Sequence, residues 1–140
     1  MKTKAMTVIA VLTLLLAAGT AFAQGTIVAD IPFDFMVNNS PMPAGQYTIE
    51  RSGNNSWGRL LLRSSDDKNV RFILANQIES AKGADMTKLV FRHYGEQYFL
   101  SEIWVEGAKS GRQLPVSRKE VSLAKNGTRV ELAEVRAFQR

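Results

Sequence analysis

Four basic residues lie close together in the C-terminal third of the sequence: Lys109, Arg112, Arg118 and Lys119. The last two occupy the first turn of a predicted helix, where the helix dipole disfavours cations by about 0.3–1 kcal/mol. Functional sites concentrate at positions that break a local rule, and arginine can hold a carboxylate or phosphate through two parallel hydrogen bonds. The cluster therefore predicts an anion site; the alternative is a solvated basic face.

Two aromatic residues could form an apolar floor beside these cations. Tyr98 and Trp104 belong to the aromatic-rich stretch 88–107, and the nearby helix would add free backbone N–H groups. We therefore predict a partner with an acidic head and an apolar or sugar body, such as an envelope lipid or an acidic glycan. The predicted ligand-binding residues are Tyr98, Trp104, Arg112, Arg118 and Lys119.

Residues that could carry catalysis or hold a metal are few. His93 is the only histidine and cysteine is absent, which excludes thiol chemistry and leaves a serine nucleophile only one possible imidazole base. Residues 66–69 lack the glycine and distal glutamate of a calcium loop and are predicted to form a turn. We predict no enzyme activity, cofactor or metal site; an enzyme would need an acid pair such as Asp34 with Glu50 in a cleft.

The first 23 residues have the features of a secretory signal peptide. Lys2 and Lys4 give a basic start, residues 6–18 are apolar apart from two threonines, and Ala21-Phe22-Ala23 is a cleavage motif. The apolar run is short for a membrane span, and the alternative is an uncleaved anchor. We predict export to the periplasm or medium, with one domain over residues 24–140 and no transmembrane segment after cleavage.

Composition limits the classes of partner. The chain has 18 basic and 13 acidic residues, a formal charge of +5, and two of the lysines belong to the predicted leader. This modest excess does not indicate nucleic-acid binding. An exported domain without disulfides must be held together by its apolar core.

The stretch 88–107 predicts a β-hairpin around Gly95. Charged residues mark the outer face, so Leu89, Phe91 and His93 should point inward from the first arm, and Phe99, Ser101, Ile103 and Val105 from the second. A three-residue loop, 94–96, would place Phe91 opposite Phe99 and Lys88 opposite Glu102. The rival is a two-residue Gly95-Glu96 turn, which suits type II′ chemistry better and would place Arg92 opposite Phe99. The preferred register leaves an apolar outer face, which another element or a ligand must cover.

The rest of the sequence alternates short β-patterns with turn signals. Residues 27–37 predict a strand that is interrupted at Pro32 or lies at an edge, because proline cannot donate to a ladder. The fold class is therefore mainly β: a single antiparallel β-meander of about seven strands, closed as a small barrel or sandwich.

A single short helix is predicted after the hairpin. Ser117 and Glu120 form an S-x-x-E capping box, and Asn126-Gly127 is a stop signal. We expect this helix to dock on the outer face of the hairpin through Val121 and Ala124.

An ordered set of motifs resembles an uncharacterised family of small exported bacterial all-β proteins. The resemblance covers most of residues 24–140 and implies an envelope or secreted location, but it supplies no catalytic residue and no ligand. The motifs are PFDF at 32–35, MPAGQYTIE at 42–50, KLVF at 88–91, YGEQYFL at 94–100, and LPxSxxE at 114–120.

These features favour an exported, non-catalytic binding or interaction module of the bacterial cell envelope for an amphipathic anionic ligand. A structural surface protein that self-associates through the strand edge at Pro32 is the main alternative, and an enzyme is a weaker one.

Processing of the leader tests the predicted export. Protein recovered from an exporting bacterial cell should begin at Gln24, because signal peptidase cuts after an A-x-A motif. N-terminal sequencing that finds Met1 retained would contradict export.

Overall fold

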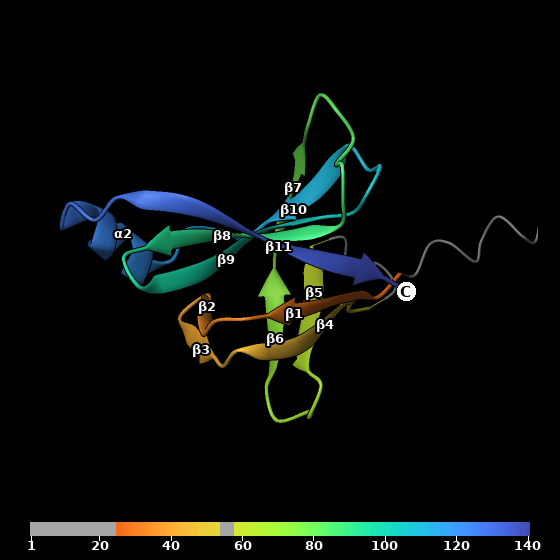
Figure 1. Cartoon of the computed structure of the whole chain (residues 1–140), viewed down its shortest axis with the longest axis horizontal. Helices are drawn as coiled ribbons and strands as arrows, with labels where there is room; N and C mark the ends of the chain where they lie inside the picture. Colours follow the sequence, from red (N-terminus) through yellow and green to blue (C-terminus); the bar gives the residue numbers. More distant parts are fainter. Residues whose placement is uncertain (1–24, 54–57) are drawn as a thin grey trace, which may run out of the picture.

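The computed structural model describes residues 25–53 and 58–140, so the predicted leader lies outside the described part. This part contains eleven strands and the helix α2 (Figure 1). No helix among these residues has the length and apolarity needed to cross a membrane.

The first half of the described chain is built only from strands. They are β1 (Ile27–Ile31), β2 (Phe35–Val37), β3 (Ser40–Met42), β4 (Gly45–Arg51), β5 (Arg59–Ser64), β6 (Val70–Leu74) and β7 (Asn76–Glu79). The second half holds the predicted hairpin and helix. Its elements are β8 (Lys88–Tyr94), β9 (Gln97–Trp104), β10 (Ser110–Gln113), α2 (Arg118–Lys125) and β11 (Val130–Gln139).

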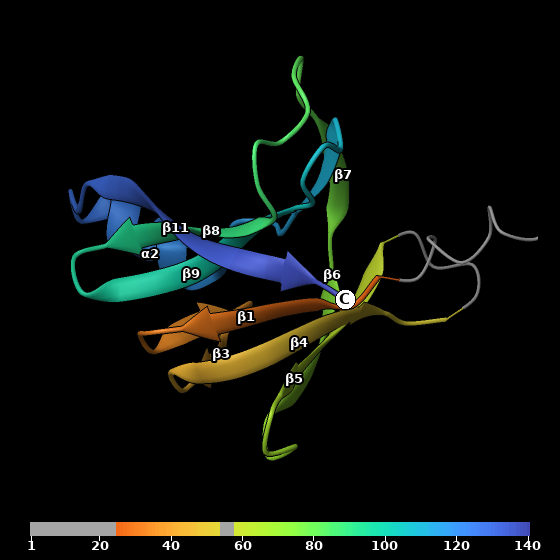
Figure 2. The ribbon, with the colours of Figure 1, turned by 45° about the vertical axis from the view of Figure 1, so that its right-hand side comes forward.

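The strands form one curled sheet that resembles an open half-barrel (Figures 1 and 2). Its order is β3-β2-β9-β8-β11-β1-β4-β5-β6, with β10 attached to β9 and β7 attached to β10. Within the described residues the predicted β-rich class and short helix are confirmed, but the predicted meander of about seven strands, closed as a barrel or sandwich, fits only loosely, because the sheet has eleven strands, includes a parallel pair and stays open. Strands distant in the sequence pair, as β1 does with β11, and β2 pairs with β9 in parallel.

Short interruptions explain the higher strand count. Pro32 follows the last residue of β1, and the chain resumes as β2 at Phe35, so the predicted interruption at Pro32 is confirmed. Ala75 separates β6 from β7, which continues in nearly the same direction (Figure 2). Strand β10 follows the hairpin after a short connection and pairs with both β7 and β9.

The core fills the concave side of the curled sheet. Inward-facing residues of β1, β4, β5 and β6 meet those of β8 and β9, and Phe91 contacts the rings of Phe33 and Phe35 edge-on at centroid distances of 5.0 and 5.5 Å. The predicted inward positions Leu89 and Phe91 are fully buried. No disulfide is needed because burial of apolar surface supplies the main stabilisation.

The hairpin register follows the rival alternative at the turn and departs from both alternatives further along. Tyr94 pairs with Gln97 and Arg92 with Phe99, as the two-residue turn predicts. Gly95 occupies the first central position of this turn with φ 60°, as a type II′ turn requires. The preferred three-residue loop is therefore wrong. Further along, Val90 pairs with Glu102 and Phe91 with Leu100, so Ser101 is an extra residue in a β-bulge.

The bulge changes which side chains of β9 face the core. Before it, Tyr98 and Leu100 pack against the core and Phe99 lies on the convex face with Tyr94; after it, Ile103 and Val105 face inward as predicted. Phe99 and Ser101 were predicted inward and are not, because the extra residue reverses the alternation. The convex face is nevertheless covered, since Phe99 and Trp104 are both buried.

The helix begins and ends where the sequence predicts. Ser117 accepts a hydrogen bond from the N–H of Glu120, and the Glu120 carboxylate accepts one from the N–H of Ser117. The helix lies on the convex face of the hairpin, as expected, but Val121 and Ala124 are exposed. Glu120 is the buried residue of α2, so an ion pair docks the helix in place of an apolar contact.

Candidate functional site

A cleft of about 440 Å³ opens at one end of the half-barrel, where the packed core stops. It lies between β1, β4 and β5 on one side and β9 and β10 on the other. Such barrel mouths commonly hold small ligands. The lining residues are Gly25, Ile27, Ile49, Glu50, Arg51, Leu60, Ile103, Val105, Ala108, Ser110, Gly111, Arg112 and Gln139.

The walls of the cleft are apolar because they continue the core. Ile27, Ile49 and Leu60 come from three neighbouring strands, and opposite them lie Ile103 of β9 and Val105, which directly follows β9. Residues on one face of a strand alternate with those on the other, so the strands that build the core also present these side chains at its open end. An apolar ligand body would contact the same surface that closes the rest of the core.

Arg112 brings a cation to this apolar wall. It pairs with Ile103 of β9 on one side and with Gln77 of β7 on the other. Directly paired residues share a face, so the side chain of Arg112 lies on the concave face with that of Ile103. Its Nη1 donates to Oε1 of Gln77 at 3.3 Å. Burial first, and the charge of Arg51 second, lower the pKa of Arg112 from its ordinary value; arginine stays protonated at neutral pH.

Arg51 is the second cation of the cleft. It continues the inward positions of β4 after Tyr47 and Ile49, whereas Glu50 lies between them on the opposite parity. The two guanidinium groups repel each other, and an anion bound between them would relieve this repulsion. The cleft therefore combines an apolar wall with two arginines, and Glu50 and Gln139 add a carboxylate and an amide to its lining.

Of the five residues predicted to bind ligand, Arg112 lines this cleft. Trp104 lies on the other side of the same strands: a Cβ atom at Gly111 would come within 2.7 Å of its indole, and its Nε1 donates to Oε2 of Glu102 at 2.8 Å. The indole is thus buried as packing for β10 and is separated from Arg112 by the sheet.

Tyr98 lies at the far end of β9. Its ring stacks between Phe33 at 3.7 Å and His93 at 3.9 Å. Six residues of strand, roughly 20 Å, separate it from Trp104, and the bulge turns the two side chains to opposite faces. The structure therefore does not assemble the predicted aromatic floor.

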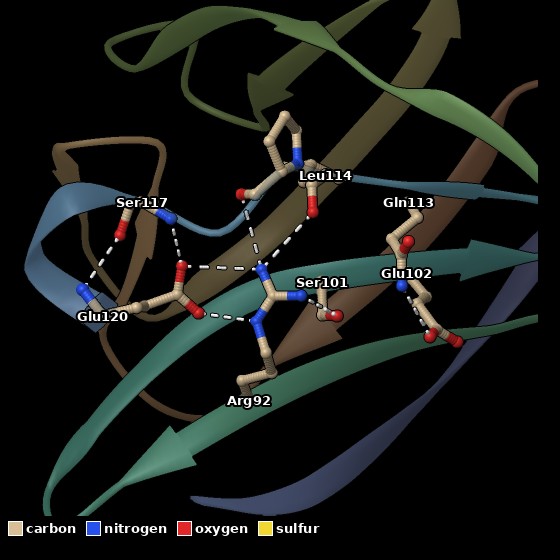
Figure 3. Close-up of polar contacts among 8 residues, drawn as sticks. Arg92, Ser101, Glu102, Gln113, Leu114, Ser117 and Glu120 are labelled. Carbon is tan, nitrogen blue, oxygen red and sulfur yellow. Dashed lines mark hydrogen bonds and ion pairs between the residues drawn. The ribbon is translucent and has the colours of Figure 1, made fainter. Parts of the chain in front are cut away.

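Arg118 and Lys119 are exposed on α2, and the helix start beside them is already capped. Glu120 supplies the carboxylate that the prediction assigned to a ligand (Figure 3). Its Oε1 accepts from Nε of Arg92 at 2.6 Å, and the side chains of Glu120 and Arg92 are only 1% and 12% exposed.

Arg92 connects three elements (Figure 3). Besides Glu120, it donates from Nη1 to Oγ of Ser101 at 2.7 Å and from Nη2 towards the carbonyl of Leu114 at 3.4 Å. One guanidinium thus holds the bulge residue, the chain that leads into the helix and the helix cap. This arrangement is structural, because the carboxylate and the guanidinium satisfy each other.

The other chemical candidates of the sequence are not assembled into a centre. Asp34 accepts a hydrogen bond from the N–H of Ala44 and is absent from the lining of the cleft that contains Glu50. Residues 66–69 form the predicted turn, with Asp67 at φ 58°. Among residues 25–53 and 58–140 there is no cluster of three or more potential metal ligands.

Arg51 and the apolar walls of the cleft were not among the residues predicted from the sequence. The alternation Tyr47, Ile49, Arg51 could have pointed to an arginine at the end of a core face. Nothing in the sequence could have placed it opposite Arg112, because β4 and β10 do not pair.

Comparison with known proteins gives no further guide: no protein-family model matches the chain, and neither the curated proteins nor the solved structures contain a match. The resemblance to exported bacterial proteins stays a prediction.

Loss of the buried ion pair should be costly. Glu120→Ala should lower the free energy of unfolding by about 3–5 kcal/mol, because it leaves the Arg92 charge buried without its partner. The matched control is Glu134→Ala, which removes an exposed ion pair to Lys88 of 2.9 Å and should cost less than about 1 kcal/mol. Urea denaturation measures both; equal losses would show that Glu120 does not dock the helix.

Proposed function

We propose that this chain is an exported, non-catalytic binding protein that takes a small amphipathic anion in the cleft at the mouth of the half-barrel. The acidic head lies between Arg112 and Arg51, and the apolar body lies against Ile27, Ile49 and Ile103. The envelope lipids and acidic glycans anticipated from the sequence share the anionic head, and the apolar wall favours an acyl chain over a sugar.

The observation that carries the proposal is a half-buried arginine on an apolar wall. Removing a charge from water is unfavourable unless a partner compensates it, and the lowered pKa of Arg112 reflects both this burial and the like charge of Arg51. Gln77 offers Arg112 a neutral acceptor. A bound carboxylate or phosphate would supply the opposite charge, and charged hydrogen bonds are the stronger kind.

Export is part of the proposal and rests on the leader-like first 23 residues. The main alternative, self-association at Pro32, has less support: β1 lies between β11 and β4 and therefore has no free edge.

Three eight-carbon compounds that differ only in the charge of their head group test binding in the cleft. Octanoate should bind, whereas octanol and octylammonium should bind weakly, because only octanoate offers an anion to the two arginines. Arg112→Gln should weaken octanoate binding by roughly 10–100-fold, the equivalent of the about 1.5–3 kcal/mol expected for hydrogen bonds to charged groups. Isothermal titration calorimetry measures each affinity, and added salt should reduce it.

Arg118→Gln is the matched control because it removes the same charge from an exposed position on α2. Its affinity for octanoate should equal that of the parent. Thermal unfolding of both variants separates lost binding from lost folding. Tight binding of octylammonium, or equal losses from the two variants, would contradict the proposal.

A further inference from the structure

Strand β6 lies at one end of the curled sheet and pairs only with β5 in the part of the chain that the structure describes. Its outward residues are Val70, Phe72 and Leu74, which are 36%, 62% and 65% exposed. An edge strand presents a row of unpaired N–H and C=O groups that can pair with another chain.

The other end of the sheet shows how this fold protects an edge. Strand β3 has only three residues, and Pro41 at its centre cannot donate to an added strand. Strand β6 has five residues, no proline and no charged residue among its three outward positions. The β3 end of the strand order is thus blocked by its sequence, and the β6 end is left available for pairing.

A groove runs beside β6 and gives the edge a binding surface. Its lining residues are Asn38, Arg59, Phe72, Leu74 and Pro115, and its volume is about 560 Å³. Arg59 is the charged residue of this lining, and Arg71 is exposed on β6 itself. The two aspartates of the turn between β5 and β6 are already engaged, since Asp67 lies 3.6 Å from Arg63 and Asp66 accepts hydrogen bonds from Ser64 and Lys68.

We propose that the free edge of β6 binds an extended, acid-bearing peptide segment of a partner protein as an added strand. Main-chain hydrogen bonds would supply affinity, and pockets for alternate side chains supply specificity in this binding mode. Apolar side chains of the segment would pack on Phe72 and Leu74, which share one face of the sheet with Arg59, while its carboxylates, at the alternate positions, would face Arg71 on the other face.

Charge disfavours a second copy of this chain as the occupant. A two-fold axis through Phe72 would pair Arg71 of each copy with Ile73 of the other and place the two arginines diagonally on one face. Long side chains at diagonal positions are within reach of each other, so the two guanidinium charges would repel. A glutamate or aspartate at the same position would instead form a favourable pair.

Two labelled peptides test this inference by fluorescence anisotropy: one alternates valine with glutamate and the other valine with lysine. The glutamate peptide should bind at least about tenfold more tightly, because like charges across the interface oppose binding. The variant Arg71→Glu should reverse this preference, because Arg71 lies on the face that receives the charged side chains of the peptide. Equal binding of the two peptides, or binding of neither, would overturn the proposal.

A matched pair of variants locates the site on the edge. Phe72→Thr should weaken binding of the glutamate peptide, whereas Val121→Thr should not. Val121 is 45% exposed but belongs to the helix α2, which has no strand edge. Sedimentation that shows dimers lost in Phe72→Thr would identify a second copy as the occupant and overturn the proposal. Octanoate binding at the cleft is independent of every one of these outcomes.

Discussion

The extra residue in β9, Ser101, is the constraint on which the rest of the structure depends. It reverses the alternation of the strand, so that Leu100 and Ile103 both reach the core. In a regular strand, two residues three positions apart would face opposite sides of the sheet. Because Arg112 pairs with Ile103, the bulge also determines that this arginine faces the cleft. Bulges are frequent beside functional sites for this reason.

The same residue links the cleft to the helix. The hydroxyl of Ser101 accepts from Arg92, whose guanidinium binds the carboxylate that caps α2. A buried ion pair adds little net stability over apolar packing, but removing one partner is costly. The pair therefore acts mainly to hold α2 at one position on the hairpin, over the convex face, while the concave face stays open at its mouth.

Local signals in the sequence predicted local structure well. The capping box at Ser117, the stop at Gly127, the interruption at Pro32 and the inward face of β8 follow from rules that act within a few residues. The bulge could not be predicted, because a register shift depends on both strands, and two turn types fitted the same residues.

The predicted site depended on that register. Arg112 alone of its five residues lines the cleft, whereas Trp104 and Tyr98 point to opposite faces and Arg118 and Lys119 lie beside a helix start that Glu120 already caps.

The central claim is that an amphipathic anion lies in the cleft with its head at Arg112. Isotope-edited nuclear magnetic resonance of the octanoate complex tests it most directly. The account predicts nuclear Overhauser effects from the acyl chain to the methyl groups of Ile49, Leu60 and Ile103, and a shift of the Nε–H resonance of Arg112. Contacts of the acyl chain with α2 or with Phe72, and an unchanged Arg112 resonance, would contradict it.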